Sequence, residues 1–344
     1  MRHVNIPLFI PHLGCPNQCV FCNQRTISGV SEFDASECDK LINEALSTVS
    51  PEDEVEIAFF GGSFTGIDFD YMVSLLKIAY SYVECGKVSS IRCSTRPDYI
   101  DEKILDTLKR YGVKTIELGL QSTDGEVLAL TKRGHTFADE LRAAKLIVDQ
   151  GFELVGQMMI GLPGSTLKKE LTTAEFIINS GAKGVRIYPT VVFRDTELCQ
   201  MTVAGGYKPL SIEDAINRSS KVLEKFIEAG IEVIRIGLCA SDNLISDDTY
   251  YAGPNHPALG ELIQSELYYK KITDQLKLID ITKDTTLNVY VSTGALSKAV
   301  GQRKRNKLRL LSIPFVKDVR FIESDDIAPY EVLVRKENGD RKCI

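Results

Sequence analysis

The feature that most limits the possible folds is a regular alternation of two patterns between residues 4 and 238. Short apolar runs typical of buried strands span residues 4–10, 55–60, 89–94, 113–120, 153–160, 184–189 and 232–238. Between them, amphipathic windows typical of helices span residues 36–48, 68–84, 101–110, 137–150, 166–180 and 211–229. Repeated strand-then-helix units predict parallel strands joined by helical crossovers, in either an open doubly wound sheet or a barrel. In both architectures, ligands bind at the carboxyl ends of the strands.

This alternation stops near residue 240, and the change predicts the domain organisation. Residues 1–240 are expected to form the α/β domain. Residues 241–284 begin with a polar stretch that carries glycine and proline, so we expect an irregular connecting segment there. Residues 285–344 contain strand and helix patterns of their own and are predicted to form a small C-terminal α+β domain.

Composition predicts a cytoplasmic protein with no membrane segment. The 344 residues are 44% hydrophobic and 26% charged, an ordinary balance for a globular protein. The first residues are too broken by proline for a signal peptide, and no apolar stretch reaches the roughly 18 residues of a membrane span. Nine cysteines in a cytoplasmic chain favour metal ligands or buried thiols over disulfides. The net charge of -6 argues against nucleic-acid binding over the whole surface, but not against a local basic patch.

Three of these cysteines, Cys15, Cys19 and Cys22, lie close together directly after the first predicted strand. They can be a chance cluster of buried thiols. They can also form a zinc site completed by His12, although zinc usually takes four ligands arranged in pairs. The third interpretation is an iron–sulfur cluster, whose usual ligands are closely spaced thiolates in one loop. Three thiolates would leave one iron of a four-iron cluster open to a substrate or cofactor.

The spacing Cys-x3-Cys-x2-Cys, with Phe21 before the last cysteine, resembles the radical S-adenosylmethionine (SAM) superfamily. The resemblance implies a partial parallel (βα)6 barrel in which the three cysteines are the catalytic ligands of a [4Fe-4S] cluster. It also implies that SAM binds the open iron, with Phe21 among the cofactor-binding residues. Reductive cleavage of SAM then produces a 5′-deoxyadenosyl radical, and a flavodoxin- or ferredoxin-type partner supplies the electron.

The segment FFGGSFTG, residues 59–66, follows the second predicted strand. Paired glycines let a backbone approach a ligand closely, although such a segment by itself is most often a turn. It resembles the Gly-Gly-acidic motif with which the superfamily holds the amino group of SAM. By that resemblance Gly61 and Gly62 contact the cofactor, and Ser63 takes the place of the usual glutamate.

Further segments resemble the radical domain of the Elongator catalytic subunit, which modifies the wobble uridine of transfer RNA. The most specific segments are ELGLQS, KRGHT, GLPGST and IYPTVV, all between residues 117 and 192. This resemblance covers residues 4–240 and implies a substrate that is transfer RNA or another RNA. It also implies that SAM is flanked by Ser94, Arg96, Gln121 and Ile160. Because the chain ends without the acetyltransferase domain of that family, we expect no binding of acetyl-coenzyme A.

Two histidines have open roles. His135, within KRGHT, is either a buried or capping residue or a substrate contact. His256 lies in a loop bounded by proline and glycine, and this loop either covers the surface or reaches the mouth of the barrel.

Residues 287–323 carry a different signal. The pattern predicts a strand at 287–291, helices at 294–300 and 305–312, and a strand at 317–323. Six basic residues lie within twelve positions of the two helices and the turn between them: Lys298, Arg303, Lys304, Arg305, Lys307 and Arg309. The order resembles the minimal unit of KH domains, whose G-x-x-G loop clamps a nucleic-acid backbone. The corresponding loop, GQRK, lacks the second glycine, so a solvated basic helix is the alternative to an RNA-binding surface.

The leading hypothesis is therefore a radical SAM enzyme that modifies RNA held partly by the C-terminal domain. One alternative keeps the radical chemistry and gives it a small-molecule substrate. The other is a non-catalytic iron–sulfur or zinc protein that binds RNA.

Overall fold

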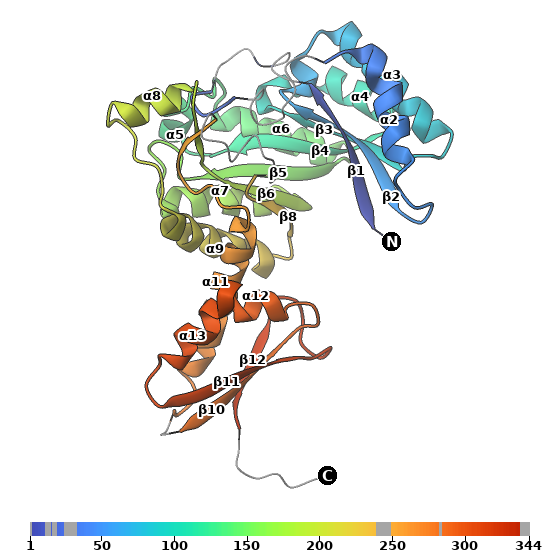
Figure 1. Cartoon of the computed structure of the whole chain (residues 1–344). Helices are drawn as coiled ribbons and strands as arrows, with labels where there is room; N and C mark the ends of the chain where they lie inside the picture. The colour runs from blue at the N-terminus through green and yellow to red at the C-terminus, as the bar shows by residue number, and fades with distance from the viewer. Residues whose placement is uncertain are drawn as a thin grey trace. The chain divides into compact units, whose positions relative to one another are not determined.

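The structure is a computed structural model that describes residues 2–10, 15, 19–23, 33–238, 249–281 and 284–337. The chain divides into two compact units (Figure 1). The first unit contains residues 1–211 and 229–255, and the second contains residues 212–228 and 256–344. No helix in the described ranges is long and apolar enough to cross a membrane.

The first unit is built on a seven-stranded sheet in the order β1-β2-β3-β4-β5-β6-β8. Its strands are β1 (His3–Ile10), β2 (Glu54–Gly61), β3 (Ser90–Thr95), β4 (Val113–Gln121), β5 (Glu153–Ile160), β6 (Gly184–Pro189) and β8 (Glu232–Ile236). All neighbouring pairs are parallel, and β1 and β8 are the two edges, so the sheet is a half-barrel. The predicted partial barrel is confirmed, because every predicted apolar run is a strand of this sheet.

Helices follow the strands in the predicted order. They are α2 (Cys38–Leu46), α3 (Phe69–Glu84), α4 (Glu102–Arg110), α6 (Phe137–Asp149) and α7 (Leu167–Asn179). The first unit also contains shorter elements: η1 (Ala35–Glu37), η2 (Phe64–Gly66), η3 (Pro97–Tyr99), α5 (Gly125–Leu130), β7 (Val192–Phe193), α8 (Glu197–Val203) and β9 (Tyr250–Ala252). Local chemistry sets the helix ends. Thr136 and Asp139 form a capping box at the start of α6, and Gly151 follows that helix with φ of 85°, a conformation that glycine adopts at low cost.

The second unit combines helices with a three-stranded sheet. Its elements are α9 (Ile212–Glu228), α11 (Leu259–Leu276), β10 (Thr285–Val291), α12 (Leu296–Val300), η4 (Gln302–Lys304), α13 (Arg305–Leu311), β11 (Val316–Glu323) and β12 (Val332–Lys336). Strand β10 is central, parallel to β11 and antiparallel to β12. Leu287, Val289 and Val319 pack against Tyr268 in the core. The predicted small α+β domain is thus present, and it includes β12, which the pattern did not predict.

The domain boundaries differ from the predicted ones in two places. Residues 212–228, predicted as part of the first domain, are helix α9 of the second unit. Residues 241–284, predicted to be irregular, contain α11. This helix packs against α9, α12 and β12, so it buries side chains on more than one side and shows no clean polar face. A helix of that kind lacks the amphipathic stripe by which sequence analysis finds helices.

Candidate functional site

The cysteine segment follows β1 at the edge where the parallel strands of the half-barrel end. Two backbone hydrogen bonds anchor it at Val20. The amide of Val20 donates to the carbonyl of Thr131 over 3.2 Å, and its carbonyl accepts from the amide of Leu198 over 2.8 Å. The amide of Cys22 donates to the carbonyl of Cys19 over 2.9 Å and closes a turn. The segment is therefore attached to the chain after α5 and to the start of α8.

Phe21 is half-buried beside the same anchor. It packs against an apolar cluster that contains Val20, Val192, Leu198 and Tyr207. The hydroxyl of Tyr207 donates to the carbonyl of Gly161 over 2.6 Å, so the turn that follows β5 also joins this cluster.

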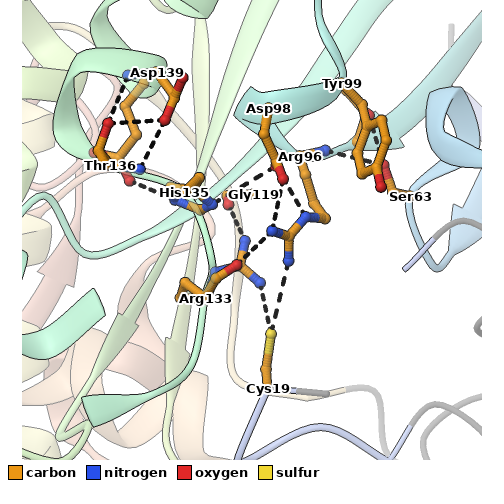
Figure 2. A network of polar contacts seen from close by, with 12 residues as sticks. Cys19, Ser63, Arg96, Asp98, Tyr99, Gly119, Arg133, His135, Thr136 and Asp139 are labelled. Carbon is orange, nitrogen blue, oxygen red and sulfur yellow. Dashed lines mark hydrogen bonds and ion pairs between the residues drawn. The ribbon is translucent and has the colours of Figure 1, made fainter. Parts of the chain in front are cut away.

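Two guanidinium groups lie beside the sulfur of Cys19 (Figure 2). Nη1 of Arg133 donates to Sγ of Cys19 over 3.2 Å, and Nη1 of Arg96 lies 3.9 Å from the same sulfur. Cys19, Arg96 and Arg133 are all buried. Charges in such surroundings are weakly screened by solvent, so this corner of the site attracts a negatively charged group bound at the sulfur.

Cys15 lies close to Cys19 and to the segment after β2. Burial raises the pKa of the Cys15 thiol, and the nearby Cys19 raises it further. A hydrogen bond from the backbone of Ser63 and the charges of Arg96 and Arg133 oppose this rise. The structure therefore brings two cysteines of the triplet, two arginines and the Gly-Gly-Ser segment into one place.

Metal ligation by the triplet stays a prediction. Within the described part of the chain, no three Cys, His, Asp or Glu side chains are grouped as a metal site. Residues 11–14 and 16–18, which include the alternative zinc ligand His12, lie outside the described residues.

The Gly-Gly-Ser segment has structural roles that the sequence did not predict. Gly61 has a φ of 108°, and a Cβ at this position would lie 2.7 Å from the carbonyl oxygen of Ile10. Only glycine therefore fits at position 61 beside β1, and this holds independently of any ligand. The amide of Gly62 donates to the same carbonyl over 2.9 Å. The buried Ser63 hydroxyl lies 2.9 Å from Oγ1 of Thr95 and joins the segment after β2 to the end of β3.

Arg96, predicted to bind a cofactor, is held by an acidic residue of its own loop. Its Nε and Nη2 donate to the two carboxylate oxygens of Asp98 over 3.0 and 2.9 Å, and Nη2 also donates to the carbonyl of Arg133. This bidentate pair fixes the plane of the guanidinium and leaves Nη1 directed toward Cys19 (Figure 2).

His135 belongs to the interior beneath the arginines, so it is a buried residue in this structure. Its Nε2 lies 3.0 Å from Oε1 of Glu140, and neither side chain is exposed. Burial and the neighbouring Arg133 and Arg96 lower the pKa of His135 to about 3, while burial raises the pKa of Glu140 to about 9. The two groups therefore form a neutral hydrogen-bonded pair at pH 7.

Three further predicted residues lie along the ends of the strands. Gln121, at the end of β4, has a φ of 68°, and its Oε1 is buried without a hydrogen-bond partner among the described residues. Ser94 accepts a hydrogen bond of 3.4 Å from Nε2 of Gln157. The carbonyl of Ile160 already accepts from both the amide and the hydroxyl of Thr190.

A chain of buried charges crosses the sheet, and sequence analysis missed it. Nε and Nη2 of Arg186 each donate to Glu117 over 2.8 Å, and Nη1 of Arg92 donates to the same carboxylate over 3.2 Å. Nε of Arg92 also donates to Glu56 over 2.6 Å. Arg92 and Arg186 are the only charged residues of their strands, and Glu56 and Glu117 are each flanked by apolar residues, which was the available signal. The negative charges of the two carboxylates equal the positive charges of the two guanidinium groups, and buried charges need such pairing.

The predicted RNA-binding residues belong to the second unit. Lys298 is on α12, Arg303 and Lys304 are in η4, and Arg305 and Lys307 are on α13. His256 also lies in this unit, where its Nδ1 accepts a hydrogen bond of 3.1 Å from the amide of Ala258. That contact is local to the turn before α11.

Comparisons with known proteins identify the family of the chain. Residues 9–177 match the model of the radical SAM superfamily, and residues 182–269 match the radical SAM C-terminal domain. The tRNA uridine(34) acetyltransferase of Methanocaldococcus infernus is 32% identical over 190 residues, which cover 48% of this chain and 35% of that protein. Elongator complex protein 3 of Bos taurus is 30% identical over 191 residues, which cover 50% of this chain and 35% of that protein.

The chain spans about a third of the length of these curated relatives. Among solved structures, the archaeal Methanocaldococcus infernus Elp3 with an N-terminal deletion has a TM-score of 0.62 and 24% sequence identity. That match covers 81% of this chain and 64% of the other, and it shows a shared fold. From the half-barrel, the cysteine segment at its edge and the two family models, the chain belongs to the radical SAM superfamily of enzymes.

Proposed function

We propose that Cys15, Cys19 and Cys22 hold a [4Fe-4S] cluster, that SAM binds beside it, and that the enzyme modifies transfer RNA. Members of the superfamily bind this cluster and SAM. When bound, the two supply reductive cleavage of SAM and radical chemistry on the substrate. The electron would come from a flavodoxin- or ferredoxin-type partner.

The observation that carries the proposal is the pair of guanidinium groups at Cys19. A cluster with three thiolate ligands and the SAM carboxylate bring negative charge into a buried place. Arg133 at 3.2 Å and Arg96 at 3.9 Å from the sulfur provide positive charge there. Hydrogen bonds to the ligating sulfurs are among the contacts by which a protein orients and tunes a cluster. The donor set and its surroundings therefore fit this group.

Gln121 is our strongest candidate for contact with SAM. Its backbone conformation is unfavourable for a residue with a side chain, and such strain is often found at functional sites. Its buried Oε1, which lacks a partner among the described residues, can accept a hydrogen bond from a ligand. The remaining candidates for cofactor contact are Phe21, Gly61, Gly62, Ser63, Ser94, Arg96 and Ile160.

The RNA substrate is inferred from the matched relatives. One is named a tRNA uridine(34) acetyltransferase and the other an Elongator complex protein, and both align with about half of this chain. The proposal takes only the substrate class from them, since the chain spans about a third of their length.

Anaerobic reconstitution tests the catalytic part. We expect about four irons and four sulfides per chain, and formation of 5′-deoxyadenosine and methionine after reduction. Cys19→Ser should abolish both products and lower the iron content. Cys85→Ser is the matched control, because Cys85 is an exposed thiol just after α3. Stoichiometric zinc without sulfide would contradict the cluster.

Nucleoside mass spectrometry tests the substrate. Bulk transfer RNA incubated with the reduced enzyme and SAM should gain a modified nucleoside that the Cys19→Ser protein does not produce. Cleavage of SAM with unchanged RNA would instead favour a small-molecule substrate.

A further inference from the structure

The basic residues of the second unit fall into two groups that the sequence did not distinguish. Lys307 pairs with Asp318 at 3.3 Å and Arg309 with Glu266 at 2.5 Å. Across the described ranges, by contrast, the side chains of Lys298, Arg303, Lys304 and Arg305 form no ion pair or hydrogen bond, and all of these except Arg305 line one pocket. Their charges are therefore available to an external anion.

Lys298, Arg303 and Lys304 lie around one pocket. Its volume is about 350 Å³, and its lining comprises Glu261, Ser265, Ser297, Lys298, Val300, Gly301, Gln302, Arg303 and Lys304. Three basic side chains outnumber one acidic side chain in this lining, although the whole chain carries a net charge of -6. Ammonium, guanidinium and hydroxyl groups all donate hydrogen bonds, so the pocket suits an anion with several acceptor oxygens.

The backbone of the pocket is held in an unusual conformation. Gly301, Arg303 and Lys304 have φ values of 80°, 51° and 62°. The left-handed region is unfavourable for residues with a Cβ, and it persists only where the surrounding structure imposes it. The loop thus presents two cations from a conformation that a free chain would rarely adopt.

Asn306 ties the chain just after this loop to α11 and α12. Its buried Nδ2 donates to the carbonyl of Ser265 over 2.8 Å, to Oγ of Ser265 over 2.9 Å, and to the carbonyl of Ala299 over 3.1 Å. A Cβ on Gly301 would lie 2.8 Å from the Ser265 hydroxyl. The loop backbone is therefore packed tightly onto α11 and α12 before any ligand binds.

We propose that this pocket binds the phosphates of an RNA backbone, an inference that rests on the proposed RNA substrate. Each phosphodiester of a strand carries a negative charge on two acceptor oxygens set tetrahedrally about phosphorus, and the pocket is larger than a single phosphate. Adjacent phosphodiesters of one strand would engage Lys298, Arg303 and Lys304. Lys307, predicted from sequence as part of the same surface, does not line the pocket and instead pairs with Asp318.

The test compares two triple variants of the 344-residue chain with the same loss of charge. The pocket variant is Lys298→Gln, Arg303→Gln and Lys304→Gln. The control variant is Lys277→Gln, Lys307→Gln and Arg320→Gln, whose wild-type residues are each in an ion pair. Filter binding with bulk transfer RNA is measured over a salt series, and thermal melting verifies that both variants are folded.

We expect the pocket variant to bind transfer RNA at least about tenfold more weakly at moderate salt. The slope of the logarithm of its binding constant against the logarithm of salt concentration should fall in magnitude by roughly 2–3, since each lost phosphate contact removes about 0.7–0.9. The control variant should resemble the wild type. Polyglutamate of matched charge should compete poorly, because its carboxylates lack the acceptor geometry of phosphate.

Equal weakening in both triple variants would overturn the pocket while leaving the RNA substrate in place. Effective competition by polyglutamate would overturn recognition of phosphate. Absence of RNA binding by the wild type, with SAM cleavage intact, would overturn the RNA substrate and the pocket together. Gly301→Ala supplies a further check, since it keeps every charge and alters the loop; a folded variant with wild-type affinity would contradict the role of the loop geometry.

Discussion

Arg133 donates a hydrogen bond to the sulfur of Cys19 over 3.2 Å, although 114 positions separate them in sequence. A second hydrogen bond, from Nη2 of Arg133 to the carbonyl of Gly119, ties the same guanidinium to β4. The charge is therefore fixed by the sheet and does not depend on the cysteine segment for its position. In the proposed holoenzyme it would lie beside one cluster ligand.

Arg133→Gln should lower the midpoint potential of the reconstituted cluster. Reduction adds negative charge, which a nearby cation stabilises. We expect a decrease of several tens of millivolts, where about 59 mV corresponds to a tenfold change in a one-electron equilibrium. A redox titration followed by electron paramagnetic resonance measures it. Lys132→Gln is the control, because exposed Lys132 pairs with Glu197. If both variants have full iron content and the same midpoint potential, Arg133 contributes only to packing.

Glu140→Gln should reduce the loss of stability at alkaline pH. Burial raises the Glu140 pKa from 4.5 to about 9, so between these values the folded state retains a proton that the unfolded state releases. Stability therefore falls as pH rises through this range. Glutamine keeps the size of the side chain and does not titrate, so the variant's melting temperature should change less between pH 6 and 9.

His135 affects the dependence of folding stability on pH at acid pH. Its pKa is lowered from 6.5 to about 3, so the unfolded state takes up a proton that the folded state excludes, and stability falls as pH drops below about 6.5. Glu140→Gln should not change this loss of stability at acid pH. Glu102→Gln, at an exposed position, is the control. If the melting temperatures of both variants fall equally between pH 6 and 9, Glu140 is ionised in the folded protein.

Glu117→Gln should destabilise the first unit strongly. The carboxylate accepts from Arg92, Arg186 and Gln157, and it is fully buried. Removing one partner of a buried ion pair leaves uncompensated charge and typically costs about 3–5 kcal/mol. Urea unfolding measures this loss. Glu153→Gln on the neighbouring strand is exposed and should cost less than about 1 kcal/mol; a similar small loss at Glu117 would mean that solvent screens the two arginines.

Gln121→Gly should weaken SAM binding without weakening the fold. Glycine relieves the positive φ, which costs roughly 1 kcal/mol or more with a side chain, but it removes Oε1. One lost hydrogen bond of about 1 kcal/mol corresponds to roughly fivefold in affinity. Calorimetry on reconstituted protein measures the dissociation constant. Lys132→Gly, also at positive φ, is the control; unchanged affinity at Gln121→Gly would remove this residue from the cofactor site.

The sequence alone determined the alternation of strands and helices, because both signals are local. An apolar run marks a strand within six to eight residues, and helix ends such as Thr136 and Gly151 depend on their immediate neighbours. The spacing of Cys15, Cys19 and Cys22 is local in the same way. These features suffice for the half-barrel and for the candidate cluster ligands.

Only the tertiary structure decided which distant groups meet. Helix α11 escaped prediction because α9, α12 and β12 cover several of its sides. The contacts of Arg133 with Cys19 and of Glu117 with Arg186 join residues on different elements, and the split of the basic residues depends on acidic partners such as Asp318 on β11. Each of these contacts depends on chain folding that brings remote charges within a few ångströms, and no local sequence pattern encodes that distance.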